Sequence, residues 1–263
     1  MSRYTSLVVS EKGIATITLL GSSDSKTEWG TPLREHRLNP GMVSSLMSDL
    51  KRCESRMDVF CVVVVNQGPF WSNGLDLAWV DANDEKSNKA FVLQVNKLME
   101  KVLTFPIPTV GAMNGHWCAA GGMLGLCFDY RVMNEDRGYF FIPAVDLGIV
   151  YSAFQIELMK SKLPMYMHRE IICFNAKRWT AKELQQNHVV DDAAPKGQVL
   201  KWALKLATTL LTKGKGPARK ALKPIKERVY AQVLATLVQE EGGSMQFGGR
   251  KSGANYAAPP SRL

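Results

Sequence analysis

The chain has 263 residues, of which 46% are hydrophobic and 22% are charged, and its formal net charge is +9 at pH 7. This length excludes a mini-protein and allows one or two domains with a large core. No apolar run approaches the roughly 18–20 residues that cross a bilayer, and the N-terminal segment lacks a signal-peptide apolar region. We therefore expect a globular protein without a membrane span.

Cysteine and histidine usage argues against disulfides and metals. There are five cysteines, an odd number, and none forms a CxxC pair. The four histidines show no metal-binding spacing. We expect buried free thiols in a reducing compartment and no metal site.

The positive charge raises the question of a polyanionic partner. Much of it lies in residues 201–233, at helical spacing, and the simplest interpretation is the solvated face of a helix. A phosphate-bearing small molecule would also suit it. We expect no nucleic-acid partner, although nucleic-acid binding stays the alternative for this charge.

The first part of the chain predicts strands and one capped helix. Residues 6–20 predict two alternating strands about a turn, and residues 22–35 predict a polar loop. Residues 39–55 predict a helix, because Asn39 can cap it and Pro40 fits its first turn. The β-branched run at residues 59–66 predicts a strand buried on both faces.

Strand and helix then alternate. Residues 89–105 predict a helix, 109–115 a strand, 116–130 a buried helix of small residues, and 130–142 strand and turn. This alternation predicts an α/β layered architecture.

After about residue 195 the pattern is almost purely helical. We therefore divide the chain into a core at residues 1–195 and a C-terminal helical region at residues 196–263, which ends in a flexible tail.

Two glycine turns follow two strand-like runs. They are WSNGLDLAWV at residues 71–80 and NGHWCAAGGMLG at residues 114–125. A helix starting near Ala119 would leave its first N–H groups without intrahelical partners, and its small residues allow close approach. The turn at Gly74 could offer a second N–H, so that two donors form an oxyanion hole. Tight helix packing also requires Ala and Gly, and that alternative stays open.

The order of four segments resembles the crotonase (enoyl-CoA hydratase/isomerase) superfamily, and most of all its plant-type peroxisomal Δ3,Δ2-enoyl-CoA isomerases. These segments are EHRLNPGM, FWSNGLDLAWV, PIPTVGAMNGHWCAAGGMLGLCFDYRVM and GYFFIPAVDLGI. The resemblance covers roughly residues 5 to 235. It implies a spiral of ββα units that forms two nearly perpendicular sheets, with a C-terminal helical region for trimerisation.

The resemblance also implies site residues. The N–H groups of Leu75 and Ala120 would form the oxyanion hole. The positions along the coenzyme A groove would be Arg37, Leu38, Ser72, Asn73, Gly74, Leu75, Ala119 and Gly121. For Arg37, an ordinary surface ion pair stays an equal alternative.

The acids of the superfamily are missing at both matching positions. A hydratase uses two glutamates, and the first position here is Met123. Isomerases keep only the second acid, which moves one proton between C2 and C4, and that position here is Ala144. Asp146 would share a face with Ala144 in an extended segment, so it is the candidate base. The resemblance also implies an Asp there beside the Glu of related isomerases, which favours a structural role for Asp146, such as a loop-cap hydrogen bond.

Other polar residues near the motifs have plainer expected roles. Asp76 is expected to cap a helix beginning at Leu77, and Asp129 to be structural. Glu157 is an outside candidate for the base. A nucleophilic pair of His116 and Cys118 would need a third, orienting group, so packing is the preferred interpretation. Packing is also preferred for two tryptophans, Trp79 and Trp117, over lining an acyl pocket.

The function implied is a shift of a cis- or trans-3 double bond to trans-2 in enoyl-CoA. It requires no metal or nucleotide cofactor, and coenzyme A arrives as part of the substrate. A catalytically impaired acyl-CoA-binding or scaffolding subunit is one alternative, and an enoyl-CoA hydratase is another. Deliberate replacement of a glutamate by Ala144 is a further alternative that the sequence leaves open.

The last three residues, Ser261-Arg262-Leu263, resemble the Ser-Lys-Leu peroxisomal address. They predict a peroxisomal or glycosomal location through the import receptor. The family resemblance implies a homotrimer or hexamer.

Overall fold

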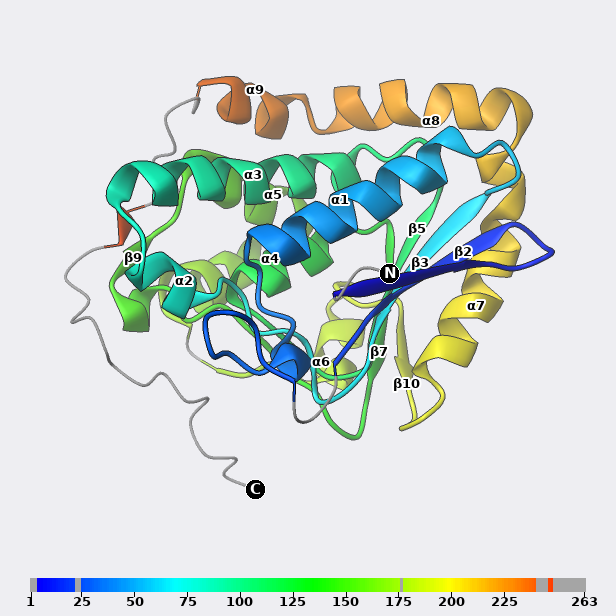
Figure 1. The fold of residues 1–263 in the computed structure, drawn as a ribbon. Coiled ribbons are helices and arrows are strands. Elements are labelled where there is room, and N and C mark those ends of the chain that lie inside the picture. Colours follow the sequence, from blue (N-terminus) through cyan, green and yellow to red (C-terminus); the bar gives the residue numbers. More distant parts are fainter. Residues whose placement is uncertain (1–3, 22–24, 176, 240–245, 248–263) are drawn as a thin grey trace.

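The computed structural model describes residues 4–21, 25–175, 177–239 and 246–247, which form a mixed α/β fold (Figure 1). A six-stranded sheet has the order β1-β2-β3-β5-β7-β10, and a three-stranded sheet has the order β4-β6-β8. The large sheet contains β1 (Thr5–Val9), β2 (Ile14–Leu19), β3 (Cys61–Asn66), β5 (Thr109–Met113), β7 (Tyr130–Asn134) and β10 (Asp192–Ala194). The small sheet contains β4 (Phe70–Ser72), β6 (His116–Cys118) and β8 (Phe140–Phe141).

Nine α-helices lie within the described residues, with a short strand pair beside them. They are α1 (Pro40–Ser55), α2 (Leu77–Asp81), α3 (Glu85–Leu103), α4 (Ala119–Leu126), α5 (Ala153–Lys162), α6 (Ala181–Gln186), α7 (Val199–Leu210), α8 (Gly216–Val229) and α9 (Ala231–Gln239). The strand pair is β9 (Ile149–Val150) with β11 (Gln246–Phe247).

The two sheets are built by a repeated ββα order. In each of the pairs β3/β4, β5/β6 and β7/β8, the first strand joins the large sheet and the second joins the small one. All neighbours within these pairings run parallel. The predicted α/β spiral of ββα units is thereby confirmed. Its second strands, β4, β6 and β8, lie side by side in the small sheet.

Local sequence explains the first helix and the central strand. Asn39 caps α1, because its side chain accepts a hydrogen bond of 2.9 Å from the Met42 N–H. Strand β3 is buried along its whole length, as predicted. Val62 and Val64 face the main core, whereas Val63 faces a second core. A strand covered on both faces needs no polar alternation.

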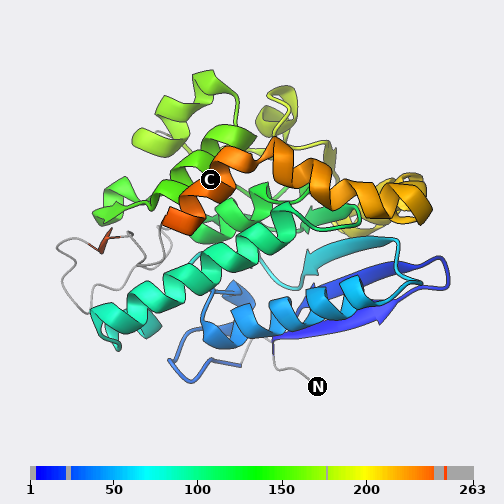
Figure 2. The ribbon, with the colours of Figure 1, turned by 90° about the horizontal axis from the view of Figure 1, so that it is seen from above.

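The C-terminal helices lie on both sides of the large sheet. Ala203 and Ala207 of α7 belong to the second core beneath the sheet. Helices α8 and α9 lie on the other side, at the top of Figure 1 and toward the viewer in Figure 2, and α9 contacts α5. Arg219 of α8 donates to the carbonyl oxygens of Val59 and Glu54 at 2.5 and 2.8 Å.

Three sequence expectations need correction. Residues 116–130 are not one helix, because His116–Cys118 form strand β6, which pairs with β4 and β8 before α4 begins. The C-terminal region also contains strand β11, which pairs with β9. Four of the five cysteines are buried as expected, but Cys173 is exposed. The Ser261-Arg262-Leu263 signal lies outside the described residues.

Candidate active site

The two glycine turns meet in space. Gly74 has a φ of +79°, and a Cβ built on it would lie 2.7 Å from the Ala119 Cβ and 3.3 Å from the Ala120 nitrogen. Only glycine fits both this backbone conformation and this contact. The two turns therefore touch at Gly74 and Ala119, and Leu75 and Ala120 line the same cavity.

The Leu75 amide is directed by a parallel bridge with Leu38. Leu38 donates its N–H to the Gly74 carbonyl at 2.7 Å and accepts from the Asp76 N–H at 2.8 Å. In such a bridge the residue between the two bonded neighbours points its own N–H the other way. The Leu75 N–H therefore points away from Leu38, and it has no hydrogen-bond partner in the described part of the chain.

The Ala120 amide lies in the first turn of α4. Ala119 has a left-handed φ of 49°, which is uncommon for a residue with a side chain. It turns the chain sharply from β6 into the helix. Within the described residues the Ala120 N–H has no partner, as expected for a first-turn amide at the positive end of a helix dipole.

Both turns border a cavity of about 260 Å³. Seven of the site positions named from the sequence line it, namely Arg37, Asn73, Leu75, Ala119, Ala120, Ala144 and Asp146. Its remaining wall is mainly apolar and includes Leu77, Met123, Ile142, Leu147 and Ile149. The arrangement can hold an apolar chain with a polar oxygen at one end.

Four named positions, Leu38, Ser72, Gly74 and Gly121, lie behind the lining of this cavity. Leu38 is buried in the core. The Ser72 hydroxyl donates to the His36 carbonyl at 2.8 Å, and a Cβ built on Gly121 would lie 2.5 Å from the Ser72 Oγ. These residues hold α4 against β4, so they keep the two turns together.

The loop after β8 carries the two acid-related positions. Ala144 is buried, and Asp146 lies in a 3-10 turn at Val145–Leu147, where it is exposed. The shared face of an extended segment therefore does not apply here, but both residues line the cavity from this loop. The Asn175 amide donates to the Asp146 Oδ2 at 2.7 Å.

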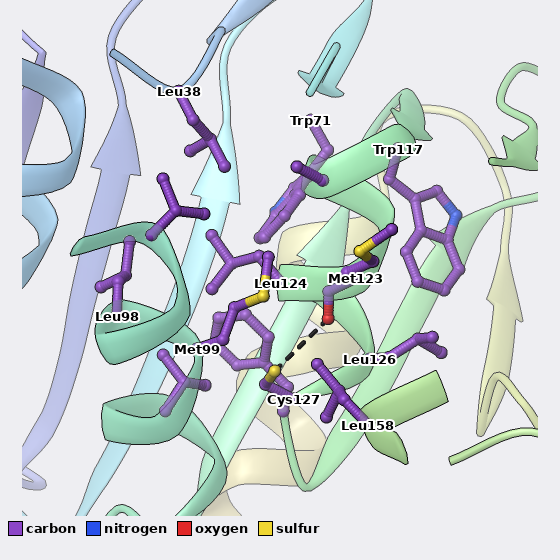
Figure 3. Packing of buried hydrophobic residues seen from close by; sticks show 14 of the residues in the cluster. Leu38, Trp71, Leu98, Met99, Trp117, Met123, Leu124, Leu126, Cys127 and Leu158 are labelled. Carbon is purple, nitrogen blue, oxygen red and sulfur yellow. Dashed lines mark hydrogen bonds between the residues drawn. The ribbon is translucent and has the colours of Figure 1, made fainter. Parts of the chain in front are cut away.

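Met123, at the first acid position, belongs to the core. It is 2% exposed and packs among Trp71, Leu124 and Trp117 (Figure 3). Its carbonyl accepts from the Cys127 thiol at 3.3 Å. No carboxylate takes its place, because Asp146 is the only carboxylate among the described residues that line the cavity.

The other carboxylates have structural partners. Asp76 sits at the cap position of α2 but makes no capping bond there, so that expectation was wrong. Its Oδ2 instead accepts from the Thr31 hydroxyl at 2.8 Å and the Asn39 amide at 3.3 Å. Asp129 is structural, as expected, because it pairs with Lys226 at 2.7 Å.

Glu157, the outside candidate, lies elsewhere. It pairs with Lys160 at 2.7 Å on the surface of α5 and does not line the cavity.

His116 and Cys118 form no nucleophilic pair in the described structure. Burial raises the pKa of the Cys118 thiol, which disfavours the thiolate. Burial first, and then Arg137 and Arg178, lower the pKa of His116. The His116 ring stacks on Tyr139 with 5.5 Å between centroids. Packing accounts for both residues.

Three polar cavity residues were missed from the sequence, namely Tyr151, Asn175 and Arg178. The Tyr151 hydroxyl lies 3.5 Å from the Ile142 carbonyl, and burial raises its pKa, so the group stays protonated. No motif marks these positions in the sequence.

Arg37 is a cavity residue that already has a carboxylate partner. It pairs with Glu35 at 2.6 Å, and it also lines the cavity. Glu35 accepts a further hydrogen bond of 3.1 Å from the Asn73 amide.

In the described ranges, no three His, Cys, Asp or Glu side chains gather in a way that could hold a metal ion. None of the helices in those ranges is long and apolar enough to span a membrane.

Comparison with known proteins agrees with the fold. Residues 31–247 match the model of the family described as enoyl-CoA hydratase/isomerase. Enoyl-CoA delta isomerase 2, peroxisomal, of Arabidopsis thaliana is 30% identical over 166 residues, which cover 61% of this chain and 69% of the relative. A putative enoyl-CoA hydratase of Thermus thermophilus is 30% identical over 181 residues, covering 67% and 70%.

Among solved structures, a probable enoyl-CoA hydratase of Mycobacterium tuberculosis superposes with a TM-score of 0.76 at 22% identity, covering 90% of this chain and 92% of that one. The fold is therefore that of crotonase-family structures. With the family model spanning most of its length, the chain belongs to the enoyl-CoA hydratase/isomerase family.

Proposed function

We propose that the chain is a Δ3,Δ2-enoyl-CoA isomerase-like protein that holds a thioester enolate on the Leu75 and Ala120 N–H groups. The observation that carries this proposal is the contact between the two glycine turns. Beside this contact, the Leu75 and Ala120 amides have no partner in the described structure, and both residues line the same mainly apolar cavity. Two such donors suit an oxygen on which negative charge develops. The isomerase relatives from Arabidopsis support the choice of reaction.

The reaction moves one proton. A base removes a proton from C2 of the 3-enoyl thioester, the electrons pass to the carbonyl oxygen, and the resulting dienolate accepts the same proton at C4. Asp146 is our candidate for the base, because it is the cavity's one carboxylate in the described structure. The Asn175 amide at 2.7 Å orients it. Chemistry of this kind needs no cofactor beyond the coenzyme A of the substrate.

Hydration is a poorer fit to this cavity. It requires an acid and a base on either side of an attacking water. Met123 and Ala144 occupy the two matching positions and neither carries a proton. The cavity then has one carboxylate in its described lining, which suffices for moving a proton but not for activating water as well.

A second candidate is an acyl-CoA-binding or scaffolding subunit without turnover. The burial of Ala144 favours it, because the position that carries the acid in related isomerases is apolar here. The exposure of Asp146 favours it too, since a base open to water lacks a dry environment. In this case the amides would bind the thioester and no proton would move.

An isomerase assay on a 3-enoyl-CoA separates the two candidates. The unaltered chain is compared with Asp146→Asn, Ala144→Glu and the control Glu157→Gln, which removes a carboxylate outside the cavity. For a positioned base we expect Asp146→Asn to lose about 10²–10⁴-fold in rate. Turnover only in the Ala144→Glu variant would identify a binding subunit. Failure of the unaltered chain to bind any acyl-CoA would refute both candidates.

We also propose a peroxisomal or glycosomal location and a trimeric or hexameric assembly. The Ser261-Arg262-Leu263 terminus and the relatives named peroxisomal support the location. A fluorescent fusion with and without these three residues tests it, and retention of the organellar signal after their removal would contradict it. Light scattering of the purified chain tests the assembly, which a monomeric mass would exclude.

A further inference from the structure

Three cationic side chains lie near the cavity, and two of them have carboxylate partners. Arg37 pairs with Glu35 at 2.6 Å. Lys177 pairs with Glu183 at 2.7 Å, and its ammonium lies over the Trp179 ring. Arg178 differs, because it has no carboxylate within ion-pair distance in the part of the chain that the structure describes.

Arg178 brings its positive charge to the wall of the cavity. Its guanidinium carbon lies 5.0 Å from the centroid of the Phe141 ring, and it lines the cavity. Phe141 is paired in register with Cys118, the residue directly before the turn at Ala119. Stacking on a ring face holds the plane of the guanidinium, while its N–H edges stay available to a planar oxyanion.

The charge of Arg178 is not balanced by the cavity's own acid. Asp146 takes its hydrogen bond from Asn175, at 2.7 Å, and forms no ion pair with Arg178. The positive charge also acts on the cavity wall: burial raises the pKa of Cys118, which lines the cavity, and Arg178 is the first of the charges that oppose this shift. A half-buried guanidinium without a protein partner is a ready site for a ligand anion.

We propose that Arg178 binds an anionic oxygen group, a carboxylate or a phosphate, carried by the thioester ligand. The inference rests on the proposed function, because it assumes that a thioester occupies this cavity. A carboxylate would come from the acyl chain, and a phosphate would come from coenzyme A. The guanidinium fork matches either group through two parallel N–H···O bonds.

Four ligands that do not turn over distinguish these sources. They are hexanoyl-CoA, adipoyl-CoA and the same two acyl groups on pantetheine, which lacks the phosphates. Calorimetry gives Kd for each ligand with the unaltered chain, Arg178→Gln and Lys177→Gln. Lys177→Gln is the matched control, because it removes the same charge one residue away from a side chain that does not line the cavity.

We expect Arg178→Gln to raise Kd about ten- to a hundredfold for the ligands that carry the recognised anion, as for loss of a charged hydrogen bond. A loss confined to the two adipoyl ligands identifies the acyl carboxylate, and a loss confined to the two CoA ligands identifies a phosphate. Lys177→Gln should change each Kd by less than about twofold, the scale of an exposed pair.

Two outcomes would overturn the inference. One is an unchanged Kd for all four ligands in Arg178→Gln. The other is an equal loss that includes hexanoyl-pantetheine, which carries neither anion. If the unaltered chain binds none of the four ligands, the proposed thioester binding itself is wrong. That result differs from one in which the unaltered chain and Arg178→Gln bind all four ligands equally well.

Discussion

At the scale of single residues, the site depends on two left-handed backbone conformations that face each other. Gly74 has a φ of +79°, and Ala119 has a φ of 49°. Glycine adopts this region freely, but a residue with a Cβ pays of order 1 kcal/mol to be there. Adding a Cβ at position 74 should therefore damage the site, whereas removing the Cβ at position 119 should not.

Gly74→Ala should damage thioester binding and turnover. The new Cβ would meet the Ala119 Cβ at 2.7 Å and the Ala120 nitrogen at 3.3 Å, so the two turns must move apart. Loss of one oxyanion donor costs about 10²–10³-fold in rate. Steady-state kinetics, or acyl-CoA affinity if there is no turnover, measures the loss. Activity equal to that of the unaltered chain would show that the turns do not need their contact.

The reverse exchange, Ala119→Gly, is the matched control. It removes the Cβ from a strained position and takes nothing from the Ala120 amide. We expect activity within about threefold and a free energy of unfolding within about 1 kcal/mol of the unaltered chain, because relieved strain and added chain entropy oppose each other. A loss as large as that of Gly74→Ala would mean that the Ala119 side chain itself contacts the ligand.

The sequence could indicate some site residues and not others. The two turns follow from local motifs, because small residues after a strand mark a turn whose amides are open. The choice of Leu75 and Ala120 within these turns came from the family resemblance. Arg178 and Asn175 carry no local signal. They reach the cavity only because the main chain at Trp179 pairs with Phe140, a tertiary contact between segments almost forty residues apart.

At the scale of elements, short strands were the hardest to predict. The helix α1 and the strand β3 have caps, length and periodicity of their own. The three residues of β6 have none of these, and the glycines and alanines that follow are common to turns and buried helices. Main-chain bonding to Pro69 and Tyr139 makes His116–Cys118 a strand. Tertiary pairing therefore decided this boundary.

The C-terminal helices meet the core at a half-buried lysine. Lys162, the last residue of α5, donates to the Tyr230 hydroxyl at 2.9 Å, between α8 and α9. Burial first, and then Arg131, lower the pKa of Lys162 to about 8. Cys127, Asp129 and Asp191 oppose this shift. The junction therefore favours a neutral amine.

The lowered pKa of Lys162 predicts a pH-dependent contribution to stability. The unfolded chain keeps the proton up to about pH 10.4, while the folded chain releases it near 8. Since the unfolded state binds more protons between these values, this contribution rises with pH across that window. Lys162→Met should exceed the unaltered chain in stability at pH 7 by an amount on the order of 1–2 kcal/mol, and this advantage should shrink by pH 10.

Urea unfolding at several pH values measures this difference. Lys160→Met, on the exposed side of the same helix, is the control and should leave the pH dependence of stability unchanged. A constant difference between Lys162→Met and the unaltered chain from pH 7 to pH 10 would contradict the prediction.

At the scale of the whole molecule, one sheet separates two cores. The main core lies between the sheet and α1, α3, α4 and α5, and the second lies against α7. Cys53 and Cys127 belong to the main core, and Cys61 belongs to the second. Burial raises the pKa of each of these three thiols to about 12. The reactivity of these three thiols therefore shows whether each of the two cores is closed to solvent.

Thiol reactivity tests this two-sided packing. Cys173 is exposed, whereas the other four thiols are buried. Because a thiol reacts as its thiolate and must be reached, we expect one fast reaction per native chain with Ellman's reagent at pH 8, and five in urea. Cys173→Ser should abolish the fast reaction. A second fast thiol in that variant would mean that one of the cores is open, and mass mapping of the labelled cysteine would show which face of the sheet is uncovered.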